Sequence, residues 1–225
     1  MKLRLLKTVV LFCLVASGAA TRAVFAQQNY DISSGGQPTI TGALGGSVTA
    51  NSDVTQNLSV IVNFGEVSPA NTNSIVKVTV PITIRSRDSY QVTVAMTASN
   101  NLDSRAIQLS DIGYGVRNLR PLGNKAQICS NGSHVFNSLL NNDPAATPSF
   151  NSSGRVTYKS TLANLTAPTV ILNGPKLTQG TGIQRRDDDG WVFDAVFVIT
   201  PQFFAASTGS ATLTFSISPG PNVPC

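Results

Sequence analysis

The chain is 225 residues long, and its 16 basic and 11 acidic residues give a formal net charge of +5. Four of the basic residues, Lys2, Arg4, Lys7 and Arg22, lie within the first 26 positions, so the rest of the chain carries 12 basic against 11 acidic residues. A net charge near +1 gives no reason to expect nucleic acid or an anionic membrane as a partner, and about 200 residues fit one domain.

The first 26 residues have the order of a cleavable secretory signal. Basic residues up to Lys7 precede an apolar run of 12 residues, from Val9 to Ala20, and small residues then lead to Ala26. A membrane-spanning helix needs roughly 20 apolar residues, so a retained anchor is the weaker interpretation. We expect cleavage after Ala26, with Ala20 as the main alternative, and no membrane span after signal removal. The protein is then secreted, periplasmic or displayed at the cell surface.

Two cysteines remain once the signal is removed. Cys13 lies inside the signal, which leaves Cys129 and Cys225 as an even pair in an oxidising compartment. We expect an intramolecular disulfide between them, because it would hold down the C-terminus and close a loop of 96 positions. Free thiols and pairing between molecules are the alternatives.

An arm of low complexity follows the signal. Residues 27–52 are rich in Gly, Ser and Thr, and their apolar residues are scattered. This composition predicts either a flexible arm or a strand that pairs with another element. We expect the folded domain to span residues 53–225.

Alternation of apolar and polar residues predicts strands from residue 58 onward. The pattern is clear at 58–64 and clearest at 76–85 and 90–98, two runs separated by a polar turn. We expect these two runs to form an antiparallel hairpin with one buried face. Pro81 lacks the backbone donor that a ladder needs, so its N–H side should be unpaired, which predicts an edge or a bulge at that position.

The remaining chain continues this pattern with irregular stretches. Residues 100–154 hold short apolar clusters between turns rich in Gly, Pro and Asn, and further strands are expected at 155–161, 169–172, 191–199 and 211–218. No long segment has helical periodicity. The sequence therefore predicts an all-β protein built as an antiparallel sandwich, with a closed barrel as the alternative.

Few side chains offer chemistry for catalysis or metal binding. His134 is the only histidine, Glu66 is the only glutamate, and no Gly-x-Ser-x-Gly motif occurs. We interpret His134 as a solvated loop residue. The acidic run 187–189, with Asp194 beyond it, lacks the ligand spacing of a calcium loop and is interpreted as a solvated turn. We predict no catalysis, no metal and no cofactor.

Three stretches together resemble a known family. They are the strand that ends Val62-Asn63-Phe64-Gly65-Glu66-Val67-Ser68-Pro69, the two strands from Val78 to Met96, and the closing strand from Ala211 to Ile217. With the Gly-rich arm before them, they are similar to bacterial fimbrial subunits, including the spore-coat-U-like and chaperone-usher pilins.

This resemblance implies an immunoglobulin-like sandwich that polymerises when the N-terminal arm of one subunit fills a groove in the next. The arm here would be residues 27–52, with Ile40, Leu44 and Val48 as groove-filling residues. The implied partners are copies of the chain or related subunits, together with a periplasmic chaperone. We therefore predict an exported structural or adhesive surface subunit. The alternative is a secreted sandwich module that binds a carbohydrate or a protein through its loops.

Overall fold

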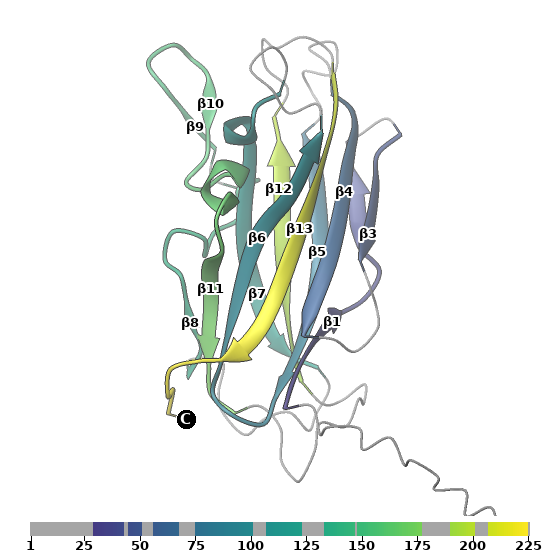
Figure 1. Ribbon diagram of the computed structural model, residues 1–225. Coiled ribbons are helices and arrows are strands. Elements are labelled where there is room, and N and C mark those ends of the chain that lie inside the picture. Colours follow the sequence, from purple (N-terminus) through teal and green to yellow (C-terminus); the bar gives the residue numbers. More distant parts are fainter. Residues whose placement is uncertain are drawn as a thin grey trace, which may run out of the picture.

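Two antiparallel β-sheets pack face to face in a sandwich-like arrangement (Figure 1). The computed structural model describes residues 29–42, 45–50, 56–67, 75–100, 107–122, 133–146, 148–176, 190–200 and 207–224. The all-β, antiparallel class expected from the alternation is confirmed. The predicted signal, both cysteines of the predicted disulfide and Leu44 lie outside the described residues.

The first sheet has the strand order β1-β5-β12-β7, with β2 also paired to β5. Its strands are β1 (Tyr30–Ser34), β2 (Thr39–Thr41), β5 (Val76–Ser86), β7 (Ile112–Pro121) and β12 (Trp191–Ile199). The second sheet has the order β3-β4-β13-β6-β11-β8 and lies in front of the first in Figure 1. Its strands are β3 (Ser47–Ala50), β4 (Asn57–Val67), β6 (Tyr90–Asn100), β8 (Val135–Phe136), β11 (Thr169–Gly174) and β13 (Ser207–Pro219).

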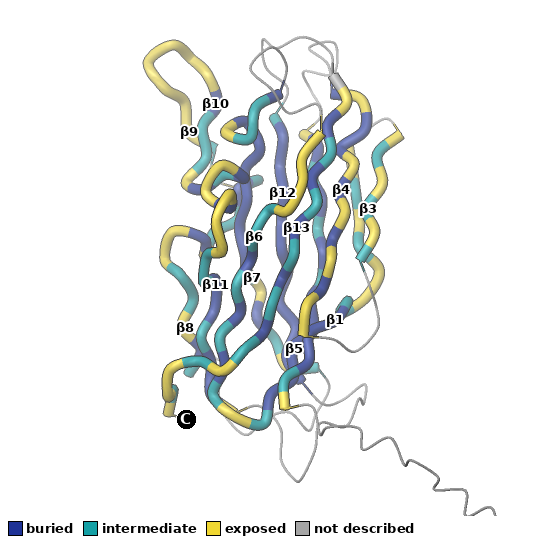
Figure 2. The backbone as a smooth tube through the Cα atoms, in the orientation of Figure 1, coloured by how far each residue is buried: buried dark blue, intermediate teal, exposed yellow. Residues whose placement is uncertain are grey.

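Shorter elements complete the described chain. A small hairpin of β9 (Ser149–Phe150) and β10 (Val156–Thr157) projects from the body of the sandwich, and most of it is exposed (Figure 2). Two single-turn 3-10 helices occur, η2 (Leu109–Asp111) and η4 (Leu162–Leu165). None of the described residues forms a helix that is long and apolar enough to cross a membrane.

The core lies between the two sheets and follows the alternation of the sequence. On β4, Leu58, Val60, Val62 and Phe64 are fully buried, and the residues between them, including Ile61, are exposed. β12 differs, because every residue from Trp191 to Ile199 is buried and its tube is dark along its length in Figure 2. Its outward side chains, such as Val196, are therefore covered as well as its inward ones.

The hairpin expected from residues 76–98 does not form, although both of its strands do. β5 pairs with β1, β2 and β12, whereas β6 pairs with β13 and β11 in the opposite sheet. Residues 87–89 therefore connect the two sheets across the end of the sandwich. Alternation shows that each strand has one buried face. Two such strands can lie in the same sheet, or in two sheets whose buried faces pack against each other, and alternation does not distinguish these arrangements.

Pro81 lies on an interior strand, contrary to the edge or bulge expected there. Its carbonyl accepts a hydrogen bond from the backbone N–H of Gly35 at 2.8 Å, on the side of β5 where β1 has ended and β2 has not begun. The missing donor of Pro81 faces this interruption, because the N–H and C=O of one strand residue point to the same side. The ladder with β12 runs past Pro81 without a break.

A bridging segment, residues 133–146 and 148–165, closes one side of the sandwich. It begins with β8 on the second sheet and then covers the free edge of β7, where Val116 N–H donates to the carbonyl of Leu140 at 2.8 Å and Tyr114 N–H to that of Ser160 at 3.0 Å. Gly115 of β7 is necessary for this contact, since a Cβ there would lie 2.2 Å from the carbonyl oxygen of Asn142.

Candidate functional site

The N-terminal strands form the outer margins of both sheets. Ile40 of β2 lies opposite Val78 of β5, and Val48 of β3 lies opposite Val62 of β4. Within the described chain, β2 and β3 each have one strand partner, and they contact each other across the margin of the sandwich. Each leaves one side of its backbone outside the ladders, which is the feature that strand addition uses.

Two of the three residues predicted to fill a groove pack on this chain's own core. Ile40 and Val48 are half-buried against the core cluster, on different sheets but at the same margin. Their strands are only three and four residues long. Glycines flank them, and two of these adopt positive φ, Gly42 at 75° and Gly45 at 71°. Short strands bounded by such turns are weakly held.

β1 is held more firmly than β2 and β3. Ile32 is fully buried in the core. Next to it, the Asp31 carboxylate pairs with the Arg85 guanidinium at 3.1 Å, and both side chains are almost fully shielded from solvent. A buried pair of this kind is costly to break, because either partner left alone is an uncompensated charge. β1 is therefore an integral strand of the first sheet.

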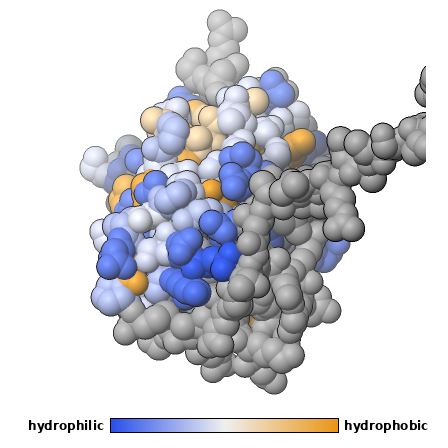
Figure 3. Space-filling view, turned by 60° about the horizontal axis from the view of Figure 1, so that its bottom comes forward, coloured by the Kyte–Doolittle hydropathy of each residue, from blue (hydrophilic) through white to orange (hydrophobic). Residues whose placement is uncertain are grey.

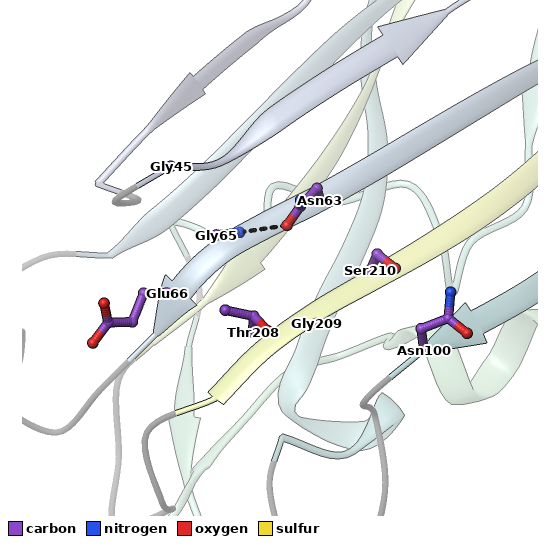
Figure 4. Close-up of a pocket in the computed structure, with 8 residues that line it drawn as sticks. All are labelled: Gly45, Asn63, Gly65, Glu66, Asn100, Thr208, Gly209 and Ser210. Atoms are coloured by element: carbon purple, nitrogen blue, oxygen red, sulfur yellow. Dashed lines mark hydrogen bonds between the residues drawn. The ribbon is translucent and has the colours of Figure 1, made fainter.

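A polar depression of about 580 Å³ lies at one end of the second sheet, where β4 and β6 end and β13 begins (Figure 4). Its lining residues are all polar or glycine: Gly45, Asn63, Gly65, Glu66, Asn100, Thr208, Gly209 and Ser210. The only glutamate of the sequence is thus part of a surface that strand register assembles from distant positions.

His134 is buried, so its interpretation as a solvated loop residue is wrong. Its side chain is enclosed beside the aromatic rings of Trp191, at a centroid distance of 4.7 Å, and Tyr90, at 6.2 Å. The Gly- and Asn-rich context of His134 is typical of exposed loops. The segment instead enters β8, which places the imidazole against the end of β12.

The acidic residues do not form a metal centre in the described part of the chain. Asp194 accepts hydrogen bonds from the Asn118 side chain at 2.7 Å and from Arg120 at 3.0 Å, so its carboxylate takes part in an ion pair. Residues 187–189 lie outside the described residues. Across the described ranges, no group of three or more His, Cys, Asp or Glu side chains is arranged to hold a metal ion.

Burial raises the pKa of several tyrosines in the described part of the chain. Burial alone raises the pKa of Tyr90 and Tyr114 well above the usual value of 10.0. Burial also raises the pKa of Tyr158, whose hydroxyl donates to the Thr200 hydroxyl at 2.8 Å and accepts from the Thr200 N–H at 2.9 Å. Tyr90 and Tyr114 pack in the core, and Tyr158 belongs to the bridging segment, which it joins to Thr200 after the end of β12.

Comparisons of the chain with protein-family models, with curated proteins and with solved structures found no match.

Proposed function

We propose that the protein is an exported structural or adhesive subunit of the cell surface, with an immunoglobulin-like sandwich and no catalytic role. The observation that carries this proposal is the position of β2 and β3 at the open margins of the two sheets. A strand edge that is free to pair can accept a strand from another chain, and an assembling subunit uses such an edge.

Exchange between copies is the mechanism of assembly. The backbone pairs that β2 makes with β5, and β3 with β4, are equally available from the same segment of a second copy. Ile40 and Val48 of one copy would then occupy, in the neighbouring copy, the same positions that they occupy within their own chain. The free energies of pairing within one chain and of pairing between copies differ only by the cost of closing the short connection and by the entropy of association.

The subunit itself stays folded during exchange because β1 does not take part. Ile32 and the Asp31–Arg85 pair anchor that strand to β5 of the same chain. Gly35 and Gly36, which follow β1, are the hinge from which the exchanging segment leaves. Gly36 has a φ of 152°, which a side chain would strain.

The surface in Figure 3 suits assembly through strand edges better than through a broad apolar face. Among the coloured residues of that view, hydrophobic ones form small separate patches between hydrophilic ones. Backbone pairing at an edge needs no large apolar patch, since main-chain hydrogen bonds provide much of the affinity.

Size-exclusion chromatography with light scattering tests the proposal. We would compare the full exported chain, a chain that lacks residues 37–50, and that truncated chain with a peptide spanning 37–50. The full chain is expected to form oligomers at high concentration, and the truncated chain to become stable and monomeric when the peptide is added. A peptide with Ile40→Asp and Val48→Asp is the matched control and is expected not to stabilise it.

One pair of results would contradict the proposal. A full chain that stays monomeric at high concentration after prolonged incubation, together with a truncated chain that is equally stable without peptide, would show that the segment neither exchanges nor completes the fold.

A further inference from the structure

The polar depression exists because the second sheet is bulged at its end. Glu66 lies opposite Thr208, and Asn63 lies opposite Ser210, so one residue of β13 faces two of β4. Gly65, inside this bulge, has a φ of 69°. A bulge bends the strand and redirects the side chains beside it. The end of the sheet is therefore hollowed instead of continuing flat.

The bulge is held by a side chain that also lines the depression. The Asn63 side-chain oxygen accepts a hydrogen bond from the backbone N–H of Gly65 at 3.0 Å (Figure 4). This contact closes a local turn over the left-handed glycine. The amide nitrogen of Asn63 is the donor end of the same group, so the contact with Gly65 orients it.

A row of hydrogen-bonding side chains crosses three strands at this point. Ser210 of β13 lies opposite Asn63 of β4 on one side and opposite Asn100 of β6 on the other. Outward residues that lie opposite one another in a ladder have neighbouring side chains. Thr208 and Glu66 form the next row towards the strand ends.

The eight lining residues exclude several classes of ligand. None of them is basic, and Glu66 is acidic, so an anionic ligand would be repelled. None has an aromatic or large aliphatic side chain, so an apolar ligand would have no apolar side chain to pack against. A calcium ion takes six to eight oxygen ligands with several carboxylates, and here there is one carboxylate.

Neutral polyhydroxyl compounds are the class of ligand that these exclusions leave. Asparagine amides and hydroxyl groups both donate and accept, as does each hydroxyl of a sugar. The glycines at 45, 65 and 209 leave backbone accessible between these side chains. We propose that the depression binds a neutral saccharide, with Asn63, Asn100 and Ser210 as its central hydrogen-bonding groups.

The outer face next to the depression supports a polymeric form of this ligand. By alternation, the side chains that point outward from β4, β13 and β6 beyond the depression are uncharged. They are Asn57, Ser59, Ile61, Thr212, Thr214, Ser216, Ser218, Gln91, Thr93, Ala95 and, at the register shift of β6, Thr97 and Ala98. A saccharide chain that leaves the depression along the strands would continue to meet hydroxyl groups and no charge.

The saccharide site rests on the proposed function in one respect only, which is that the protein is exposed at the cell surface. Assembly exchanges residues 37–50, whose strands pair with β5 and β4, whereas Asn100 and Ser210 of the depression lie on β6 and β13 and pair with neither β2 nor β3. Variants at Asn100 and Ser210 are therefore expected to leave the oligomeric state unchanged, so failure of one proposal is distinguishable from failure of the other.

An array of neutral gluco-, manno- and galacto-oligosaccharides, with sulfated and sialylated oligosaccharides as references, is the first test with the purified full chain. We expect saturable binding to at least one neutral oligosaccharide and weaker binding to the acidic ones. Titration of that oligosaccharide into isotope-labelled protein is expected to shift the amide resonances of Gly65 and Gly209 in nuclear magnetic resonance spectra.

Variants locate the site. Ser210→Tyr fills the depression and Asn100→Ala removes an exposed amide, and each is expected to weaken binding by about tenfold or more. Thr157→Ala, on the β9–β10 hairpin and outside the second sheet, is the control and should change the affinity by less than about twofold. Thermal unfolding of each variant verifies that it is folded, and Asn100→Ala, at an exposed strand end, keeps the test valid if Ser210→Tyr does not fold.

Four outcomes would overturn the inference. They are no binding to any neutral oligosaccharide, preferential binding to sulfated ones, an affinity that folded Asn100→Ala and Ser210→Tyr leave unchanged, and loss of binding when a chelator removes calcium.

Discussion

Replacing Gly115 with alanine tests whether the bridging segment is packed on β7 as tightly as the structure shows. The added Cβ would lie 2.2 Å from the carbonyl oxygen of Asn142 and 3.0 Å from Cδ of Pro144. An ordinary contact would require a shift of roughly 1 Å or more. Because the obstacle at Asn142 is backbone, a rotamer change cannot relieve it. The shift would stretch the hydrogen bond from Val116 N–H to the Leu140 carbonyl, now 2.8 Å long.

Two costs then add. Overpacking of this kind costs about 1–3 kcal/mol, and a lost backbone hydrogen bond about 1 kcal/mol. We expect Gly115→Ala to lower the free energy of unfolding by about 2–4 kcal/mol, measured by equilibrium unfolding in urea. Gly154→Ala is the control, because Gly154 has a φ of 76° and an added Cβ would meet no atom within 4 Å, so only its conformational cost of about 1 kcal/mol applies.

Limited proteolysis provides a second measurement of the same prediction. Cleavage within residues 133–165 should become faster in Gly115→Ala than in the parent protein, because the segment packs less tightly on β7 and opens more often. A Gly115→Ala protein whose unfolding free energy stays within about 0.5 kcal/mol of the parent, with unchanged proteolysis, would refute the packing described for this segment.

Three further predictions concern the core, pH and the cysteines. Phe215 is fully buried at the centre of the second sheet, and Phe215→Ala is expected to cost about 3–5 kcal/mol in urea unfolding. Burial raises the pKa of Tyr90 and Tyr114 above 10.0, so the folded protein keeps protons that the unfolded chain loses. Stability should be insensitive to these groups below pH 10.0 and should fall above it by about 1.4 kcal/mol per pH unit for each tyrosine, as unfolding followed over a pH series would show. Intact mass with and without reductant should reveal one disulfide, Cys129 to Cys225, and two thiols that alkylate without reduction would exclude it.

Local patterns predicted most of the strands. The alternation from Leu58 to Phe64 is reproduced residue by residue in β4, and the runs at 76–85, 90–98 and 211–218 are β5, β6 and β13. Side chains alternate between the faces of any strand, so a period of two in the sequence is enough to identify a strand and its buried face. The stretch from residue 100 to 154 was less readable for two reasons. It contains β7, which was not predicted because consecutive residues from Ile112 to Val116 are all buried and leave no alternation. It also contains part of the bridging segment, which is held by single hydrogen bonds and glycine contacts that leave no period.

What the sequence determined by itself is therefore the local part: an all-β chain, the faces of its strands and the apolar residues of its core. Only the tertiary structure decided which strands are neighbours. It placed β5 and β6 in opposite sheets, buried His134 against Trp191, and brought Asn63, Asn100 and Ser210 into one row. These outcomes depend on contacts between residues far apart in the chain, and a pattern of two-residue period carries no information on which distant strand will share a ladder.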